Sequence, residues 1–174
     1  MQSVEFRSEL RDPETAMAAL VRAGASPLVT LELRDTYYRV PSGAFKKREA
    51  PDEPVEYIFT DRKDRPSPHM CQFISYDEAQ MRLRYGQADP PIWRIVCKTR
   101  IALMRANVRI NLDEIDGLGQ FCKLQALVSP SYNVARCYEN IGELRHILGP
   151  TLGEPLTGTY ADMLDANEPE RAIG

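Results

Sequence analysis

The fold is decided by residues 106–128, which read ANVRINLDEIDGLGQFCKLQALV. Polar and apolar residues alternate on both sides of a glycine-bearing turn, so the pattern predicts two adjacent strands, 106–114 and 120–128. Side chains alternate across a strand, which places apolar residues such as Ile110 on one face. The opposite face carries Arg109, Asn111 and Asp113. One face therefore seeks an apolar core, and the other collects charge.

The same arrangement recurs in other segments, where charged or polar residues two apart share a strand face. The further sets are Glu5, Arg7 and Glu9; Lys46 and Arg48; Lys98 and Arg100; and Lys123 with Gln125; Arg39 and Arg62 lie near the ends of their own strands. An ordinary sheet with one solvated face would also show such a pattern. Because the cations recur on separate strands while most acids lie in loops and helices, we favour a curled sheet with this face inward. Such a cavity would attract a phosphate or another multiply charged anion.

The rest of the chain predicts further strands and a few helices, an arrangement that favours an antiparallel α+β domain. Besides the two strands already described, the strands are expected at 3–11, 28–40, 44–49, 55–62 and 92–104. Helices are expected after a cap at Asp12, from a capping box at Ser75 and Glu78 to Tyr85-Gly86, over 131–148, and over Tyr160 to Leu164. We expect one domain over 1–166, followed by a polar, frayed tail over 167–174.

Composition limits the classes of partner. The formal charge of -3 argues against general binding to DNA, RNA or anionic membranes. The sequence shows no apolar run long enough to cross a bilayer and no signal-peptide pattern, so we expect a cytoplasmic protein. The four cysteines are widely spaced and form no Cys-x-x-Cys pair, which favours reduced and mostly buried thiols over a zinc site.

Several segments resemble the CYTH family of adenylyl cyclase and thiamine-triphosphatase relatives, in particular its class IV adenylyl cyclase branch. The matching segments, in order from residue 4 to about 164, are Val4 to Pro13, Asp35 to Glu49, Val96 to Arg100, Arg109 to Phe121 and Thr159 to Leu164. The resemblance implies an eight-stranded antiparallel, tunnel-like β-barrel with flanking helices. It also implies basic side chains that hold the phosphates of a nucleotide or triphosphate, and acids on the first and last strands that hold a divalent metal ion.

The sequence departs from this family at the metal-binding acids. Where the family's first strand has Glu-x-Glu-x-Lys, this chain has Glu5, Arg7 and Glu9. Where the family's last strand has Glu-x-Glu, it has Lys123 and Gln125. Lysine and arginine cannot coordinate Mg²⁺ or Mn²⁺, which require oxygen ligands. We therefore expect no cofactor and no metal site; Glu5 and Asp113 are the residual candidates if Mg²⁺ or Mn²⁺ is used.

Two interpretations of the substituted positions stay open. Arg7 and Lys123 either bind the anion directly, or they pair with Glu5, Glu9 or Asp113 and neutralise a decayed metal site. The candidate catalytic residues are Glu5, Glu9, Tyr37 and Asp113. The candidate ligand-binding residues are Arg7, Arg39, Lys46, Arg48, Arg62, Lys98, Arg100, Arg109 and Lys123.

We favour a protein that binds a compact phosphorylated or carboxylated anion, such as a nucleotide, polyphosphate or organic acid. It would be a repurposed enzyme without two-metal phosphoryl chemistry. The first alternative is a metal-dependent adenylyl cyclase or triphosphate hydrolase, and the second is a non-catalytic interaction module. If the chain is an enzyme, the resemblance implies a divergent lyase or hydrolase. We expect no nucleic-acid or membrane partner, and a homodimer is compatible with the resemblance.

Overall fold

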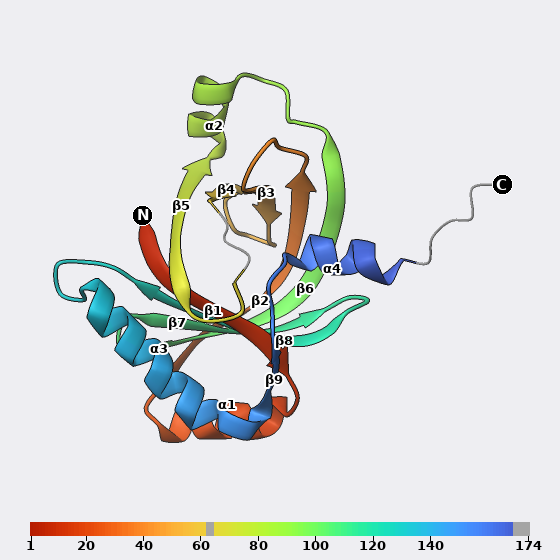
Figure 1. The fold of residues 1–174 in the computed structure, drawn as a ribbon. Coiled ribbons are helices and arrows are strands. Elements are labelled where there is room, and N and C mark those ends of the chain that lie inside the picture. The colour runs from red at the N-terminus through yellow and green to blue at the C-terminus, as the bar shows by residue number, and fades with distance from the viewer. Residues whose placement is uncertain (62–64, 169–174) are drawn as a thin grey trace.

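In the computed structural model, which describes residues 1–61 and 65–168, an antiparallel sheet of nine strands curls round on itself and carries four α-helices (Figure 1). The strands are β1 (Gln2–Leu10), β2 (Ser26–Tyr38), β3 (Ala44–Glu49), β4 (Glu56–Thr60), β5 (His69–Asp77), β6 (Ile92–Arg105), β7 (Val108–Ile115), β8 (Gly119–Leu127) and β9 (Leu152–Pro155). The helices are α1 (Pro13–Arg22), α2 (Glu78–Tyr85), α3 (Val134–Leu148) and α4 (Tyr160–Asn167), with a short 3₁₀ turn, η1 (Gly149–Thr151), after α3.

Eight of these strands close into a ring of pairings. The order along the sheet is β5-β4-β3-β2-β6-β7-β8-β1-β9, and β5 pairs back onto β1. The first residues of β1, Gln2 to Glu5, pair with β5, whereas Ser8 and Leu10 at its other end pair with β9. The expected tunnel-like antiparallel barrel is therefore confirmed, with β9 as an additional strand that the sequence pattern did not predict.

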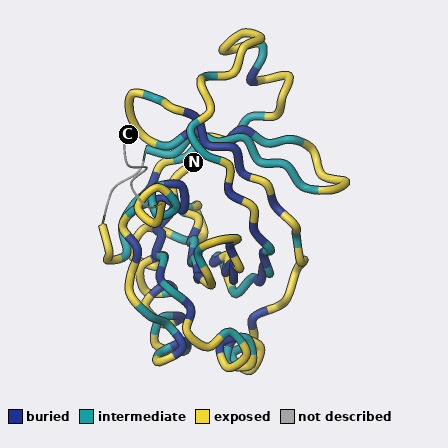
Figure 2. The backbone as a smooth tube through the Cα atoms, turned by 90° about the vertical axis from the view of Figure 1, so that its right-hand side faces the viewer, coloured by how far each residue is buried: buried dark blue, intermediate teal, exposed yellow. Residues whose placement is uncertain are grey.

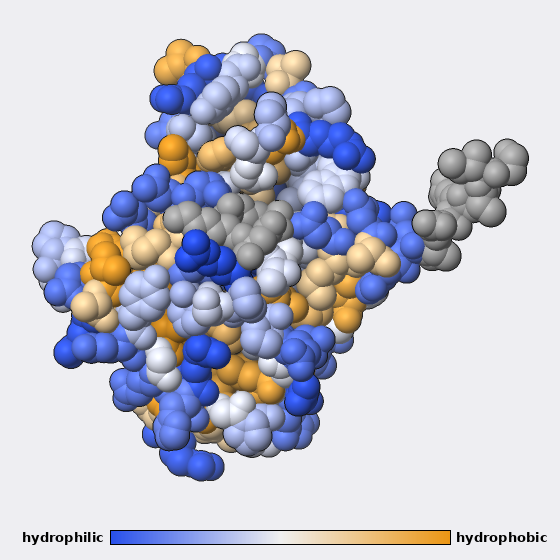
Figure 3. Space-filling view, viewed as in Figure 1, coloured by the Kyte–Doolittle hydropathy of each residue, from blue (hydrophilic) through white to orange (hydrophobic). Residues whose placement is uncertain are grey.

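The main hydrophobic core lies between the outside of the barrel and two helices. Outward-facing residues of β1, β7 and β8, such as Phe6, Ile110 and Leu124, are at most 3% exposed. They share one buried cluster with Leu20 of α1 and Leu144 of α3. In Figure 2 the tube of the barrel strands changes repeatedly between buried and less buried residues, as alternation predicts. On the molecular surface shown in Figure 3, hydrophilic residues predominate and hydrophobic residues form smaller patches.

The first residue of α1 is set by a local capping signal, whereas that of α2 is set by the pairing of the preceding strand. Asp12 caps α1 as expected, because its Oδ1 accepts a hydrogen bond from the Thr15 N–H at 3.1 Å. The capping box expected at Ser75 and Glu78 is wrong. Strand β5 stays paired with β4 as far as Asp77, so the cap of α2 is Asp77, with Gln80 completing the capping box. The Ser75 hydroxyl instead donates to Glu56 Oε1 at 2.5 Å.

The remaining element boundaries differ modestly from expectation. Strand β4 ends at Thr60 rather than at 62, and α4 continues past Leu164 to Asn167. Helix α3 begins at Val134, where Asn133 accepts from the Arg136 N–H at 2.9 Å, rather than at 131. The sequence pattern did not predict β5.

Most of the cysteine side chains are buried. All four cysteines are free; Cys71, Cys122 and Cys137 are buried and Cys97 is exposed. This arrangement confirms the expectation of mostly buried thiols.

Among the helices within residues 1–61 and 65–168, none combines the length and apolar character needed to cross a bilayer.

Candidate functional site

The inward face of the barrel surrounds a cavity of about 190 Å³. All eight strands of the closed ring contribute to its lining, together with Tyr160 of α4. Its lysine and arginine lining residues are Arg7, Lys46, Arg48, Lys98, Arg100, Arg109 and Lys123, and His69 also lines it. The volume is below the roughly 300–1,000 Å³ of pockets for drug-sized ligands, so the cavity suits a compact ligand.

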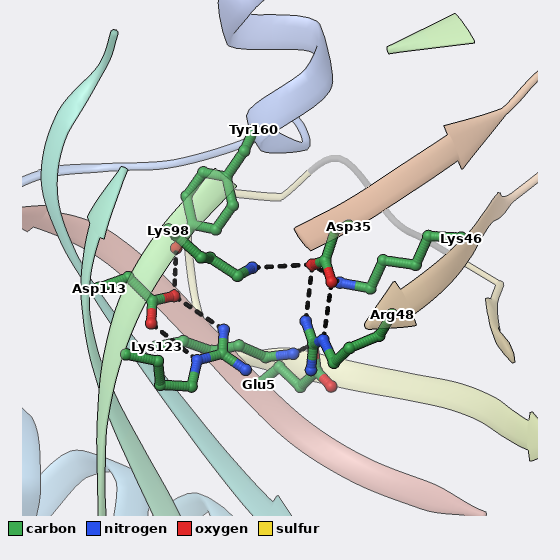
Figure 4. A network of polar contacts seen from close by, with 9 residues as sticks. Glu5, Asp35, Lys46, Arg48, Lys98, Asp113, Lys123 and Tyr160 are labelled. Carbon is green, nitrogen blue, oxygen red and sulfur yellow. Dashed lines mark hydrogen bonds and ion pairs between the residues drawn. The ribbon is translucent and has the colours of Figure 1, made fainter. Parts of the chain in front are cut away.

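Asp35 is the centre of the most concentrated group of charges in the cavity wall. Its side chain is wholly buried and lies on β2, between the neighbouring strands β3 and β6. Figure 4 shows three cations pointing at it. Arg48 binds both carboxylate oxygens, with Nε 2.8 Å from Oδ1 and Nη2 2.7 Å from Oδ2. Lys46 Nζ lies 3.1 Å and Lys98 Nζ 2.9 Å from Oδ2.

These contacts keep Asp35 ionised in a buried position. Burial alone would raise the pKa of Asp35, but Lys46, Lys98 and Arg48 together hold it well below its usual range. One carboxylate thus faces three basic groups. Counted with both lysines protonated, the group has a formal excess of two positive charges.

The pKa values of Lys46 and Lys98 are lowered as well, but for a lysine a lowered pKa favours the neutral form. Burial, reinforced by Arg48, lowers the pKa of Lys46 to about 8 even though Asp35 favours its charged form. Burial lowers the pKa of Lys98 well below its usual value; Asp35 opposes this shift, and Arg100, Lys46 and Arg48 add to it. The Lys98 side chain is 0% exposed, and its Nζ makes no directed hydrogen bond within the described part of the chain, despite the close ion pair with Asp35.

A second buried pair joins Arg100 and Asp113. Arg100 Nε and Nη2 donate to the two carboxylate oxygens at 2.7 Å and 2.8 Å. The Tyr160 hydroxyl lies 3.3 Å from Asp113 Oδ2. Although burial opposes ionisation, Arg100 lowers the pKa of Asp113 to about 2. Both oxygens of Asp113 are therefore already bound by protein groups.

Glu5 is bound in a similar way on β1. Lys123 Nζ lies 3.6 Å from Glu5 Oε2, and Ser3 and Gln125 donate to Oε1 at 3.1 Å and 2.9 Å. Burial opposes ionisation, but Lys123 and these hydrogen bonds lower the pKa of Glu5. Burial in turn lowers the pKa of Lys123.

The carboxylates of Glu5 and Asp113 do not fit a divalent metal ion in this arrangement. Each is held by a different basic side chain, which occupies oxygen atoms that Mg²⁺ or Mn²⁺ would need. Across residues 1–61 and 65–168, no group of three or more His, Cys, Asp or Glu side chains is placed to hold a metal ion. The donor set is suited to an anion instead.

Two cations of the cavity have no carboxylate partner within salt-bridge distance among the residues described. Arg7 donates from Nη2 to the Gly158 carbonyl at 2.6 Å, and its guanidinium lies 5.9 Å from the Tyr160 ring. Arg109 lines the cavity from β7 and is exposed. Acidic neighbours of the cavity are Glu5 and Glu56 in its lining and Asp35 and Asp113 in contact with it. Seven bases against four acids leave a formal excess of three positive charges.

Most of the candidates from the sequence meet at this cavity. Nine of them line it, namely Glu5, Arg7, Tyr37, Lys46, Arg48, Lys98, Arg100, Arg109 and Lys123. Asp113 lies directly behind Arg100. Burial, with Asp35 adding to it, raises the pKa of Tyr37, so its hydroxyl is a hydrogen-bond donor rather than a base at neutral pH.

Besides Asp113, two of the described candidates, Glu9 and Arg39, are not among the cavity-lining residues. Glu9 lies opposite β9, where its Oε2 accepts from the Glu154 N–H at 3.4 Å. Arg39 follows the end of β2, is exposed, and stacks 5.9 Å from the Trp93 ring. Arg62 lies outside the described residues.

Sequence reasoning missed two residues that shape the site. Asp35 is two residues from Tyr37 on β2 and therefore shares its strand face, and this spacing is the available signal for its inward position. Tyr160 lies in one of the segments that resemble the family but has no alternation signal, because it is on helix α4, which follows β9. Its ring packs 5.3 Å from Phe121 and covers Lys98, whose Nζ is 5.0 Å from the ring centre.

The chain is similar to known proteins in structure but not in sequence. No protein-family model matches the chain, and no curated protein matches it by sequence. A proposed adenylate cyclase from Vibrio parahaemolyticus has a TM-score of 0.70 at 16% identity, covering 94% of this chain and 97% of that chain. An adenylyl cyclase homologue from Hippeastrum, described as having a dominant triphosphatase activity, gives 0.60 at 13% identity, over 96% and 97%.

A third similar structure is not described as a cyclase. A chain of the Schizosaccharomyces pombe Mediator head module has a TM-score of 0.63 at 9% identity, covering 89% of this chain and 98% of that chain. At these identities the likenesses concern the fold. The chain has the α+β tunnel fold of the adenylate cyclase-like proteins.

Proposed function

We propose that this chain is a CYTH-type protein that binds a compact phosphorylated or carboxylated anion in its tunnel without a divalent metal ion. It would be a repurposed enzyme that has lost two-metal phosphoryl chemistry. The observation that carries this proposal is the convergence of seven basic side chains on a cavity of about 190 Å³. A phosphate or carboxylate would form charge-assisted hydrogen bonds there, which are stronger than those between neutral groups.

The cavity would be costly as a purely structural feature. Buried ion pairs seldom stabilise a fold more than well-packed apolar residues of similar volume would. The excess of positive charge adds to that cost when no anion is bound. This argues for a ligand over the second alternative, a non-catalytic interaction module, whose support is the structural similarity to a Mediator chain.

Metal-dependent cyclisation or hydrolysis of a triphosphate is the second candidate, and the named activities of the structural neighbours favour it. It would require Glu5 and Asp113 to leave Lys123 and Arg100 and bind a metal ion instead. Lys123 and Gln125 offer no carboxylate on β8 to help them. We therefore rank metal-free anion binding above it.

Compact anions should raise the thermal stability of the protein in the presence of EDTA. A ligand at 100 times its Kd stabilises the native state by about 2.7 kcal/mol, which corresponds to roughly 5–10 °C in Tm for a domain of this size. The measurement is a thermal-shift series with phosphate, pyrophosphate, triphosphate and small carboxylates, each with EDTA and with Mg²⁺. Arg109→Ala should reduce the shift without unfolding the protein, because Arg109 makes no ion pair with the described residues.

Arg136→Ala is the matched control, since Arg136 is a largely exposed arginine on α3 and lies away from the cavity lining. It should leave the shift unchanged. A shift that requires Mg²⁺ would favour the metal-dependent alternative. No shift with any of these anions would favour the interaction module.

A further inference from the structure

Lys46 and Lys98 both rest against a single carboxylate oxygen. Their Nζ atoms lie 3.1 Å and 2.9 Å from Asp35 Oδ2, and Arg48 binds both oxygens of the same carboxylate. Three cations therefore share one buried negative charge. Arginine does not release its proton under ordinary conditions, so a lysine is the group that can relieve the excess charge.

Lys98 is the lysine that burial disfavours most as a cation. Its side chain is 0% exposed, compared with 20% for Lys46, and the Tyr160 ring lies over its Nζ. Its Nζ makes no directed hydrogen bond within the described part of the chain. The charged groups around it are Asp35, Lys46, Arg48, Arg100 and Asp113. Burial lowers the pKa of Lys98, with these three cations adding to the shift, which agrees with a neutral amine.

We propose that Lys98 is a nucleophilic amine that forms an imine with a small anion carrying a ketone or aldehyde group, such as a 2-oxo carboxylate. A lysine that is desolvated and placed next to another cation has the environment that activates amines for this reaction. The inference rests on the proposed anion site, because Arg7 and Arg109 supply the positive charge for the carboxylate of the substrate. It names the substrate class of that site.

The covalent step balances without any further reactant. The Nζ lone pair attacks the carbonyl carbon, the π pair of the C=O bond moves to oxygen, and that oxygen takes up a proton to give a carbinolamine. The nitrogen then loses a proton, the hydroxyl group takes one up and leaves as water, and a C=N bond replaces the C–O bond. Lys46, whose pKa is about 8, is the proton donor beside Lys98, and Asp35 balances the charge of a protonated imine.

Borohydride trapping tests this inference on the whole protein. Incubation with pyruvate and sodium borohydride should add one reduced pyruvate per chain, and peptide mapping by mass spectrometry should place it on Lys98. Acetone has the same reactive group without the carboxylate and should label Lys98 at least tenfold more slowly. Lactate has the charge without the ketone and should give no adduct.

Lys98→Arg places a guanidinium at this position, which cannot form an imine, so it should abolish the adduct. Lys47→Arg is the matched control, because Lys47 is on the same strand as Lys46 but pairs with Glu49 at 3.3 Å and does not line the cavity. It should be labelled like the unaltered protein. Thermal shifts with pyruvate and phosphate in EDTA are measured on all three proteins.

The outcomes separate the inference from the proposed function. If pyruvate and phosphate stabilise the protein but no adduct forms, or if adducts spread evenly over exposed lysines, imine formation is overturned and the anion site stands. If neither anion stabilises the protein and no adduct forms, both proposals fall. Labelling confined to Lys98, together with stabilisation by both anions, supports both.

Discussion

Asp35→Asn is expected to lower the free energy of unfolding by about 3–5 kcal/mol at pH 7, which is typical of breaking a buried ion pair by removing one partner. The substitution preserves shape but leaves Lys46, Arg48 and Lys98 without the carboxylate that they share. Urea unfolding, followed by circular dichroism in phosphate-free buffer, measures the loss. Asp52→Asn is the control, because Asp52 is exposed and should change stability little.

Added anions and a higher pH should each restore part of the stability that Asp35→Asn loses. Sulfate or phosphate should restore stability more in Asp35→Asn than in the unaltered protein, because the anion replaces the missing carboxylate. Raising the pH from 7 to 9 should also help: the pKa of Lys46 and Lys98 is lowered in the folded state, so the unfolded chain binds more protons and stability rises with pH. A loss below about 1 kcal/mol would contradict the assigned network.

Asp113→Asn is expected to cost about 2–3 kcal/mol at neutral pH, and the cost should shrink in acid. Arg100 lowers the pKa of Asp113 from 3.8 to about 2 against the effect of burial. A shift of that size corresponds to about 2 kcal/mol. Because the folded pKa is the lower one, this stability is fully present above pH 4 and is lost as the pH falls toward 2.

Urea unfolding of both proteins between pH 7 and pH 2 measures this dependence. The unaltered protein should lose stability steeply between pH 4 and pH 2, and Asp113→Asn should follow a flatter curve. Asp116→Asn, at an exposed position in the turn before β8, is the control and should behave like the unaltered protein. Parallel curves for Asp113→Asn and the unaltered protein would show that the pair with Arg100 does not stabilise the fold.

The observed pairs combine the two interpretations that the sequence left open. Lys123 does pair with Glu5, as the neutralising interpretation expects. Arg7 pairs with no carboxylate in the described chain and turns its guanidinium to the Gly158 carbonyl and the Tyr160 ring. Lys123 therefore neutralises Glu5, whereas Arg7 leaves a positive charge available for a ligand.

Alternation predicted much of this fold, because the inward and outward faces differ so clearly in chemistry. Ile110 of β7 and Leu124 of β8 face outward and are buried against the helices, whereas Lys123, also on β8, faces the cavity. By contrast, β5 and β9 were not predicted. β9 is four residues long, LGEP, and pairs with Ser8 and Leu10 of β1, beyond the residues of β1 that pair with β5. This open stretch of β1 results from the strand pairing and is not visible in the local sequence.

The centre of the site depended on contacts that sequence spacing does not reveal. Lys46 and Arg48 are 11 and 13 residues from Asp35, but Lys98 is on β6, which reaches Asp35 only through sheet pairing. The cations were found because each strand carries its own pair. The acid that binds three of them could be identified only once β3, β2 and β6 were placed side by side.

Isothermal titration of pyrophosphate into the protein in EDTA tests the central claim most directly. We expect saturable binding to one site, with an affinity that does not improve when Mg²⁺ replaces EDTA. Because anion binding raises the pKa of Lys46 from about 8, binding at pH 8 should also take up protons, seen as a dependence on the ionisation heat of the buffer. Absence of binding in EDTA, with binding restored by Mg²⁺ or Mn²⁺, would contradict the account.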